Sequence, residues 1–163
     1  MKLSRRKFLT YVLGSTAGFL GASILFPMLR YMIDPLFKVN EEELYVDTGL
    51  DVTKITDIPT HVEFTVKRKD GWYKPQKGEL MSAWVLKSGG TILALSPICK
   101  HLGCTVNWNS NPKYKGQFFC PCHFGRYTKE GINVPGTPPN KPLDRYKTKV
   151  IDGKLFLGPI IRI

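Results

Sequence analysis

The first long pattern in the chain is an uncharged stretch of twenty residues, TYVLGSTAGFLGASILFPML, over residues 10–29. A helix rises about 1.5 Å per residue, so this stretch spans roughly 30 Å, the hydrocarbon thickness of a bilayer. No small-x-small cleavage pattern follows it; Arg30 and Tyr31 come next. The pattern predicts an uncleaved transmembrane anchor over residues 10–29.

From residue 46 onward, the pattern changes to short apolar segments between turn signals. Val62, Phe64 and Val66 alternate with polar residues and predict one buried face of a strand within residues 61–69. Two glycine-containing turns separate further strand-like segments and predict β-hairpins: Ser88-Gly89-Gly90 between residues 83–87 and 91–96, and Asp152-Gly153 between 147–151 and 154–158. No convincing amphipathic helix follows residue 50.

These patterns predict a mainly β protein with one N-terminal transmembrane helix. We expect a basic segment over residues 1–9, the anchor over 10–29, a linker or hinge over 30–45, and an antiparallel β domain over 46–163. The stretch with least strand character predicts a small inserted subdomain at about residues 96–140.

The charge is strongly basic, with 24 Lys and Arg against 13 Asp and Glu, a net +11. This raises nucleic acid as a partner, but residues 1–30 hold five of the basic groups and no acidic ones, and the rest are spread along the chain. No RNP-like aromatic sequence, helix-turn-helix pattern or basic helix is present. We therefore exclude nucleic acid and expect a mildly basic face that suits an acidic protein.

The N-terminal string Ser-Arg-Arg-Lys-Phe-Leu, residues 4–9, resembles the twin-arginine export signal, which carries folded proteins across a membrane. The alternative is a positively charged flank that only orients the helix. In both cases the basic N-terminus is expected in the cytoplasm and the β domain on the outer face of the cell membrane.

Two short loops, SPICKHLGCTV (residues 96–106) and CPCHFG (residues 120–125), hold all four cysteines and two of the three histidines. Structural zinc takes four ligands, usually from C-x(2–4)-C or H-x(3–5)-H pairs. Here Cys99 pairs with His101 across one residue and Cys120 with His123 across two, which is not a usual zinc pattern, and two cysteines are left over. Two disulfides would leave both histidines unexplained. A thiol redox site would need a C-x-x-C motif, which is absent.

The pattern C-x-H-(x18)-C-x-x-H resembles the Rieske [2Fe–2S] signature of quinol-oxidising cytochrome complexes. The resemblance implies one [2Fe–2S] cluster with four ligands, Cys99 and Cys120 on one iron and His101 and His123 on the other. It further implies a disulfide between Cys104 and Cys122 that crosslinks the two loops. A disulfide requires an oxidising compartment, in agreement with export.

The same resemblance implies residues that tune the cluster. Tyr127 would hydrogen-bond a ligand sulfur, Leu102 would shield the cluster and face the quinone pocket, and Gly136 and Pro138 belong to a GTPP loop that would cover it. Gly125 departs from the family pattern, because a serine often stands there and donates to a bridging sulfide. Loss of that donor predicts a lower potential, which suits menaquinol. The 105–119 spacer is slightly long and predicts a larger surface loop.

The resemblance implies a subunit of a quinol:cytochrome c oxidoreductase. It would take an electron from menaquinol, with a proton through His123 or His101, and pass the electron to a c-type haem. Cytochrome b-type and c-type subunits are the expected partners, within a dimeric complex. Two alternatives are a Rieske subunit of another exported oxidase, such as an arsenite-oxidase-like enzyme, and a disulfide-stapled structural or zinc-binding domain.

Overall fold

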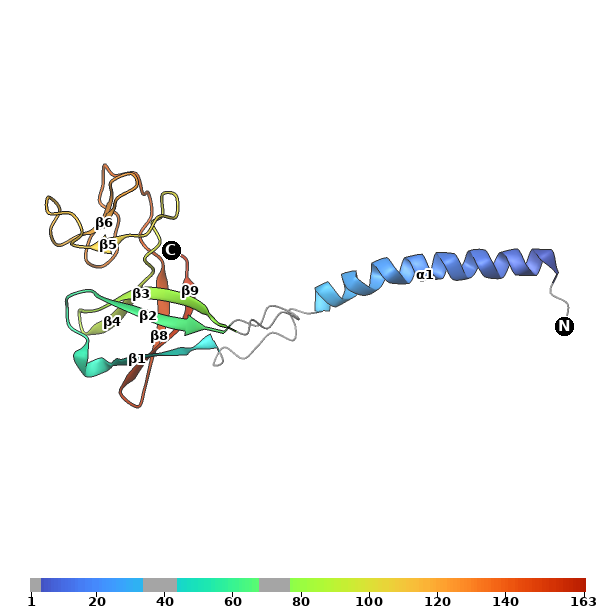
Figure 1. Ribbon diagram of the computed structural model, residues 1–163, viewed down its shortest axis with the longest axis horizontal. Coiled ribbons are helices and arrows are strands. Elements are labelled where there is room, and N and C mark those ends of the chain that lie inside the picture. The colour runs from blue at the N-terminus through green and yellow to red at the C-terminus, as the bar shows by residue number, and fades with distance from the viewer. Residues whose placement is uncertain (1–3, 34–43, 68–76) are drawn as a thin grey trace. The chain divides into compact units, whose positions relative to one another are not determined.

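The computed structural model describes residues 4–33, 44–67 and 77–163. The chain divides into two compact units, residues 1–40 and 41–163, and each is described by itself. The first unit contains helix α1 (Arg5–Ile33), and the second contains the β strands (Figure 1). Most of the predicted linker lies outside the described residues.

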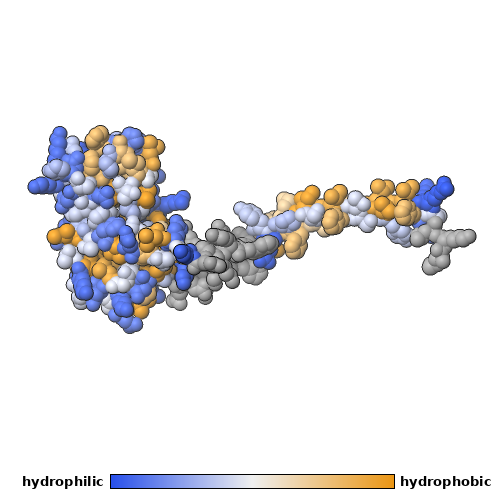
Figure 2. All heavy atoms as spheres, viewed as in Figure 1, coloured by the Kyte–Doolittle hydropathy of each residue, from blue (hydrophilic) through white to orange (hydrophobic). Residues whose placement is uncertain are grey.

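Helix α1 starts earlier and ends later than the predicted anchor. Ser4 caps it, because its hydroxyl accepts from the Lys7 N–H (3.4 Å) and its carbonyl from the Phe8 N–H (3.0 Å). Arginine and lysine are good helix formers, so the helix continues past the apolar boundary. None of its side chains is buried, and apolar groups line it in Figure 2. Its length and composition suit a single-pass membrane anchor.

A six-stranded antiparallel sheet, the base sheet, forms the larger part of the second unit. Its strands, in spatial order, are β1 (Val46–Asp51), β9 (Lys154–Ile161), β8 (Arg145–Ile151), β4 (Thr91–Leu95), β3 (Glu79–Ser88) and β2 (Thr60–Val66). The sheet curls until its edge strands β1 and β2 lie close to each other. A short 3-10 helix, η3 (Val52–Lys54), follows β1.

Both predicted hairpins are confirmed. Gly89 and Gly90 connect β3 to β4 with φ of 57° and 81°, and Asp152 and Gly153 connect β8 to β9 with φ of 51° and 74°. Two consecutive positive φ angles match the twist of the paired strands, which favours glycine and aspartate there. The alternation in β2 is also confirmed, because Val62 and Phe64 are buried between exposed neighbours.

A second, three-stranded sheet is inserted into the base sheet. It consists of β5 (Asn107–Trp108), β6 (Phe118–Cys120) and β7 (Gly125–Tyr127), in that order. The chain leaves the base sheet after Leu95 and returns at Arg145, and these two residues pair with each other. The prediction of a mainly β protein with one N-terminal apolar helix is therefore confirmed.

Two apolar cores support these sheets. One lies within the base sheet and includes Val62, Phe64, Val85 and Leu155. The other joins the base to the inserted sheet and consists of Leu86, Leu95, Cys99, Val106, Phe118, Cys120, Tyr127 and Leu143. The second core thus includes Cys99 and Cys120 from the cysteine loops and Tyr127 from β7, and it fixes the backbone beneath the two loops.

Candidate metal centre

The first cysteine loop, residues 96–106, closes on itself. The Cys99 N–H donates to the Cys104 carbonyl (2.8 Å), and the Gly103 N–H donates to the Cys99 carbonyl (3.0 Å). Gly103 has a φ of 81°, a left-handed conformation that costs glycine little. The turn leaves His101 and Leu102 exposed at its apex.

The second cysteine loop, residues 120–125, turns between β6 and β7, where Cys120 pairs with Gly125. Phe124 has a φ of 60°, which is uncommon for a residue with a side chain. His123 and Phe124 are exposed, so this turn also presents an imidazole and an apolar group to solvent.

The structure separates the four cysteines into two pairs. Cys104 and Cys122 form a disulfide that joins the two loops. Cys99 and Cys120 are free thiols, 3% and 2% exposed. The exposed rings of His101 and His123 lie edge to face with centroids 4.8 Å apart. The two loops therefore bring together two buried thiols and two solvent-facing imidazoles.

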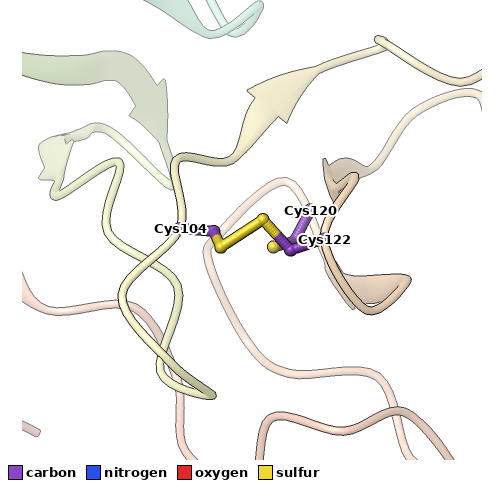
Figure 3. Close-up of side chains that lie close together, drawn as sticks. All are labelled: Cys104, Cys120 and Cys122. Carbon is purple, nitrogen blue, oxygen red and sulfur yellow. A yellow bond between two sulfur atoms is a disulfide. The ribbon is translucent and has the colours of Figure 1, made fainter.

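Three of the four sulfur atoms are close neighbours. The sulfurs of Cys104, Cys120 and Cys122 all lie within 4.8 Å of one another (Figure 3). They do not form a three-thiolate metal site, because the disulfide occupies two of them. The potential ligands that remain are Cys99, Cys120 and the two histidines, which is also a zinc donor set.

Tyr127 sits beneath the first loop and is fully buried. Its hydroxyl accepts the backbone N–H of Lys100 (2.8 Å) and lies 3.2 Å from the Cys99 sulfur. Burial, and next the hydrogen bond with Cys99, raise the pKa of Tyr127 well above its ordinary value, so the hydroxyl keeps its proton. Because the Lys100 N–H already donates to this oxygen, we infer that the hydroxyl donates to the Cys99 sulfur.

Cys120 is also supplied with donors. Burial raises the pKa of the Cys120 thiol, and the backbone N–H groups of Cys122 and His123 act in the opposite direction by hydrogen-bonding its sulfur. Sulfur ligands of an iron–sulfur cluster are stabilised by such donors. Both buried thiols thus have hydrogen-bond donors beside their sulfurs, and the four residues fit a [2Fe–2S] cluster with two imidazoles.

Gly125 is held in place by packing. A Cβ at Gly125 would lie 3.1 Å from the Cδ of Pro139 and 3.4 Å from the Cβ of Cys120. Pro139 is fully buried, whereas Pro138 is exposed and a Cβ at Gly136 would meet nothing within 4 Å. Both prolines belong to the predicted GTPP loop, but only Pro138 was singled out from the sequence, because the order of two adjacent prolines does not show which one faces inward.

A polar clamp, also missed by sequence reasoning, ties the first loop to the base sheet. The Lys100 ammonium lies 2.7 Å from Asp144 Oδ1, with both side chains less than one fifth exposed. The same oxygen accepts the Ile163 N–H (3.1 Å), and the Asp144 carbonyl accepts the Ser96 N–H (2.8 Å). Lys100 and Asp144 are far apart in sequence, so no local pattern signals the contact.

The exposed apexes of the two cysteine loops, which we call the tip, carry apolar side chains as well as the imidazoles of His101 and His123. Leu102 is 70% exposed and Phe124 67% exposed. Beside it, in the spacer between β5 and β6, Tyr114 stacks on Phe119 with centroids 5.9 Å apart, and the Arg126 guanidinium lies 4.4 Å above the Tyr114 ring. These contacts anchor the long spacer to the inserted sheet.

Residues 51–147 match the Rieske [2Fe-2S] domain family. The chain is 51% identical over 156 residues to the menaquinol:cytochrome c reductase iron-sulfur subunit of Bacillus subtilis (strain 168), covering 96% of this chain and 92% of that protein. It is 51% identical over 158 residues to the subunit of the same name from Geobacillus thermodenitrificans, with the same shares. It is also 31% identical over 154 residues to the cytochrome b6-f complex iron-sulfur subunit of Chlorobaculum tepidum, covering 94% and 75%. The chain therefore belongs to the Rieske [2Fe-2S] domain family, whose cluster fits the paired thiols and imidazoles of the tip.

Proposed function

We propose that this chain is the iron–sulfur subunit of a menaquinol:cytochrome c reductase, an electron-transfer subunit that works beside cytochrome b-type and c-type subunits. The identity of 51% to two subunits of that name extends over 96% of the chain, and so includes the anchor as well as the cluster domain. The observation that carries the proposal is the crosslinked tip, where two buried free thiols lie beneath two exposed imidazoles.

The geometry of the tip supports one ligand set. Cys99 and Cys120 would hold one iron, and His101 and His123 the other, while the Cys104–Cys122 disulfide keeps the two loops together. When bound, the [2Fe–2S] cluster supplies a one-electron acceptor. Tyr127 and the backbone N–H groups of the second loop orient the two sulfurs and stabilise their negative charge.

The exposed residues of the tip receive the quinol. In His123 and His101 one ring nitrogen would bind iron, and the other would be free to take the proton of the quinol hydroxyl. Leu102 and Phe124 contact the apolar ring of the quinol and exclude water from the proton's path. We assign His123 the direct contact.

Gly125 has two consequences, and the first of them fits the menaquinol assignment. It provides no hydroxyl to stabilise the reduced cluster, which favours a low potential and a low-potential donor. It also lets Pro139 pack against the second loop. Gly136 and Pro138 belong to the same covering loop, and Pro138 lies on its exposed side.

Export and orientation form a second part of the proposal. Residues 1–9 remain in the cytoplasm, residues 10–29 span the membrane, residues 30–45 tether the domain, and residues 46–163 lie outside. A disulfide persists in an oxidising compartment, which supports this orientation. Replacement of both Arg5 and Arg6 by lysine keeps the positive charge and should leave the protein protected from protease added outside the cell. Normal protease sensitivity of that variant would refute the twin-arginine assignment.

The function is tested by purifying the tagged full chain from membranes of its own host. We expect haem b and haem c absorbance to copurify with it, together with menaquinol-dependent reduction of cytochrome c, in a complex of dimeric size. Copurification of a molybdenum subunit without haem b would instead support an arsenite-oxidase-like enzyme. A colourless preparation that contains zinc and no iron would support the structural alternative.

A further inference from the structure

The geometry points to a thiol–disulfide exchange site at the tip: we propose that, without its cluster, the Cys120 thiol attacks the Cys104–Cys122 disulfide and rearranges it. The inference rests on the proposed function in one respect, since Cys120 is kept from attacking the disulfide only if it binds iron. Its consequence is an order of maturation, in which the cluster must be bound before the disulfide forms.

Proximity is the first argument. The sulfurs of Cys104, Cys120 and Cys122 lie within 4.8 Å of one another, and Figure 3 shows the Cys120 sulfur beside the disulfide. Rotation about the single χ1 bond of Cys120 moves its sulfur without moving the backbone. Cys99, the other free thiol, is not part of this three-sulfur group. The structure therefore selects Cys120 over Cys99 as the attacking thiol.

The step is balanced within the chain. The Cys120 sulfur forms a bond with the Cys104 sulfur as the Cys104–Cys122 bond breaks, and the proton lost by Cys120 ends on the Cys122 sulfur. One disulfide and one thiol are present before and after, so no oxidant or reductant is required. The new Cys104–Cys120 bridge closes a loop only two residues shorter, and the entropy of loop closure barely opposes it.

The effect of the exchange depends on the surroundings of Cys120, the free thiol before it, and Cys122, the free thiol after it. It moves the free thiol from the buried position of Cys120 to the exposed position of Cys122. The bridge still joins the two loops, but one of the four iron ligands is lost. Loss of the cluster is then not reversed spontaneously, because the rearranged protein cannot bind a new cluster until the disulfide is reduced.

Disulfide mapping of the full-length protein tests the exchange. Wild type is stripped of iron by a chelator, incubated without oxygen, alkylated, digested and analysed by mass spectrometry. Two variants serve as a matched pair, since Cys99→Ser and Cys120→Ser each remove one ligand and leave the disulfide cysteines intact. We expect a Cys104–Cys120 bridge with alkylated Cys122 in stripped wild type and in Cys99→Ser, and only the Cys104–Cys122 bridge in Cys120→Ser.

Retention of the Cys104–Cys122 bridge alone in stripped wild type would overturn the proposal. So would new bridges to Cys99 as frequent as those to Cys120, because that result indicates exchange through unfolded chains. As a second measurement, stripped wild type should lose the ability to take up iron and sulfide during incubation and regain it after brief reduction. The visible spectrum of untreated protein tests the proposed function separately, so failure of one does not imply failure of the other.

Discussion

Tyr127→Phe should change both the stability of the protein and the midpoint potential of its cluster. The hydroxyl makes two contacts, with the Lys100 N–H at 2.8 Å and the Cys99 sulfur at 3.2 Å, in a fully buried position. Its removal leaves the Lys100 N–H without its acceptor, so unfolding should become easier by about 1–3 kcal/mol.

The expected potential shift follows from the same hydrogen bond. The reduced cluster carries more negative charge on its sulfurs, so the hydrogen bond to Cys99 is stronger in the reduced than in the oxidised state. A hydrogen bond to a charged group exceeds a neutral one by about 1–2 kcal/mol. Since 59 mV corresponds to about 1.4 kcal/mol for one electron, the variant's potential should fall by roughly 40–80 mV. The assay is a redox titration of the purified protein followed by EPR, with stability measured by chemical denaturation.

Tyr146→Phe is the matched control. Tyr146 is a second buried tyrosine, but it belongs to the base-sheet core. Its hydroxyl donates to the backbone carbonyl of Ser82 at 3.2 Å. This variant should lose about 1 kcal/mol of stability and keep the wild-type potential. An unchanged or higher potential in Tyr127→Phe would refute the inferred donation to Cys99.

Three further predictions concern other parts of the domain. Gly125→Ala and Gly125→Ser should both lower the melting temperature, by the equivalent of about 1–3 kcal/mol, because the added Cβ crowds Pro139. The midpoint potential of the serine variant should be higher than that of the alanine variant, and equal potentials would contradict the missing-donor explanation. Asp144→Asn should raise the midpoint potential because it leaves the Lys100 charge uncompensated, and Lys100→Gln should lower it. Shifts of the same sign in both variants would show that the ion pair acts only through the structure of the loop. Hydrogen bonds from the following turn lower the pKa of Asp51 below its ordinary value, so its stabilising effect is present above about pH 4 and fades as the pH falls further. The difference in denaturation midpoint between wild type and Asp51→Ala should therefore be smaller at pH 3 than at pH 7, and a constant difference would disprove this.

Local features of the fold could be predicted from the sequence. Gly89-Gly90 and Asp152-Gly153 tolerate the left-handed turns of tight hairpins, and the alternation of Val62 and Phe64 marks one buried face. The order of the strands could not be predicted, because β1 pairs with β9 and β4 with β8 across long sequence separations. The start of α1 at Arg5 was missed because basic residues carry no apolar signal yet continue a helix.

The candidate site shows the same division. The six cysteine and histidine positions could be recognised from spacing and family resemblance, since their residue types and intervals are unusual. The groups around them could not. Pro139 packs against Gly125 within the inserted segment, and Asp144, next to β8 of the base sheet, pairs with Lys100 of the first cysteine loop. Such contacts depend on long-range packing, which a local pattern does not encode.

The central claim is that two cysteines and two histidines of the crosslinked tip hold one [2Fe–2S] cluster. Pulsed EPR of the reduced full-length protein, with iron and sulfide quantified on the same sample, tests it most directly. The predicted result is two irons and two sulfides per chain and magnetic coupling to two histidine nitrogens, with one coupling lost in His123→Cys. An EPR-silent sample, or a cluster with no coupled nitrogen, would contradict the claim.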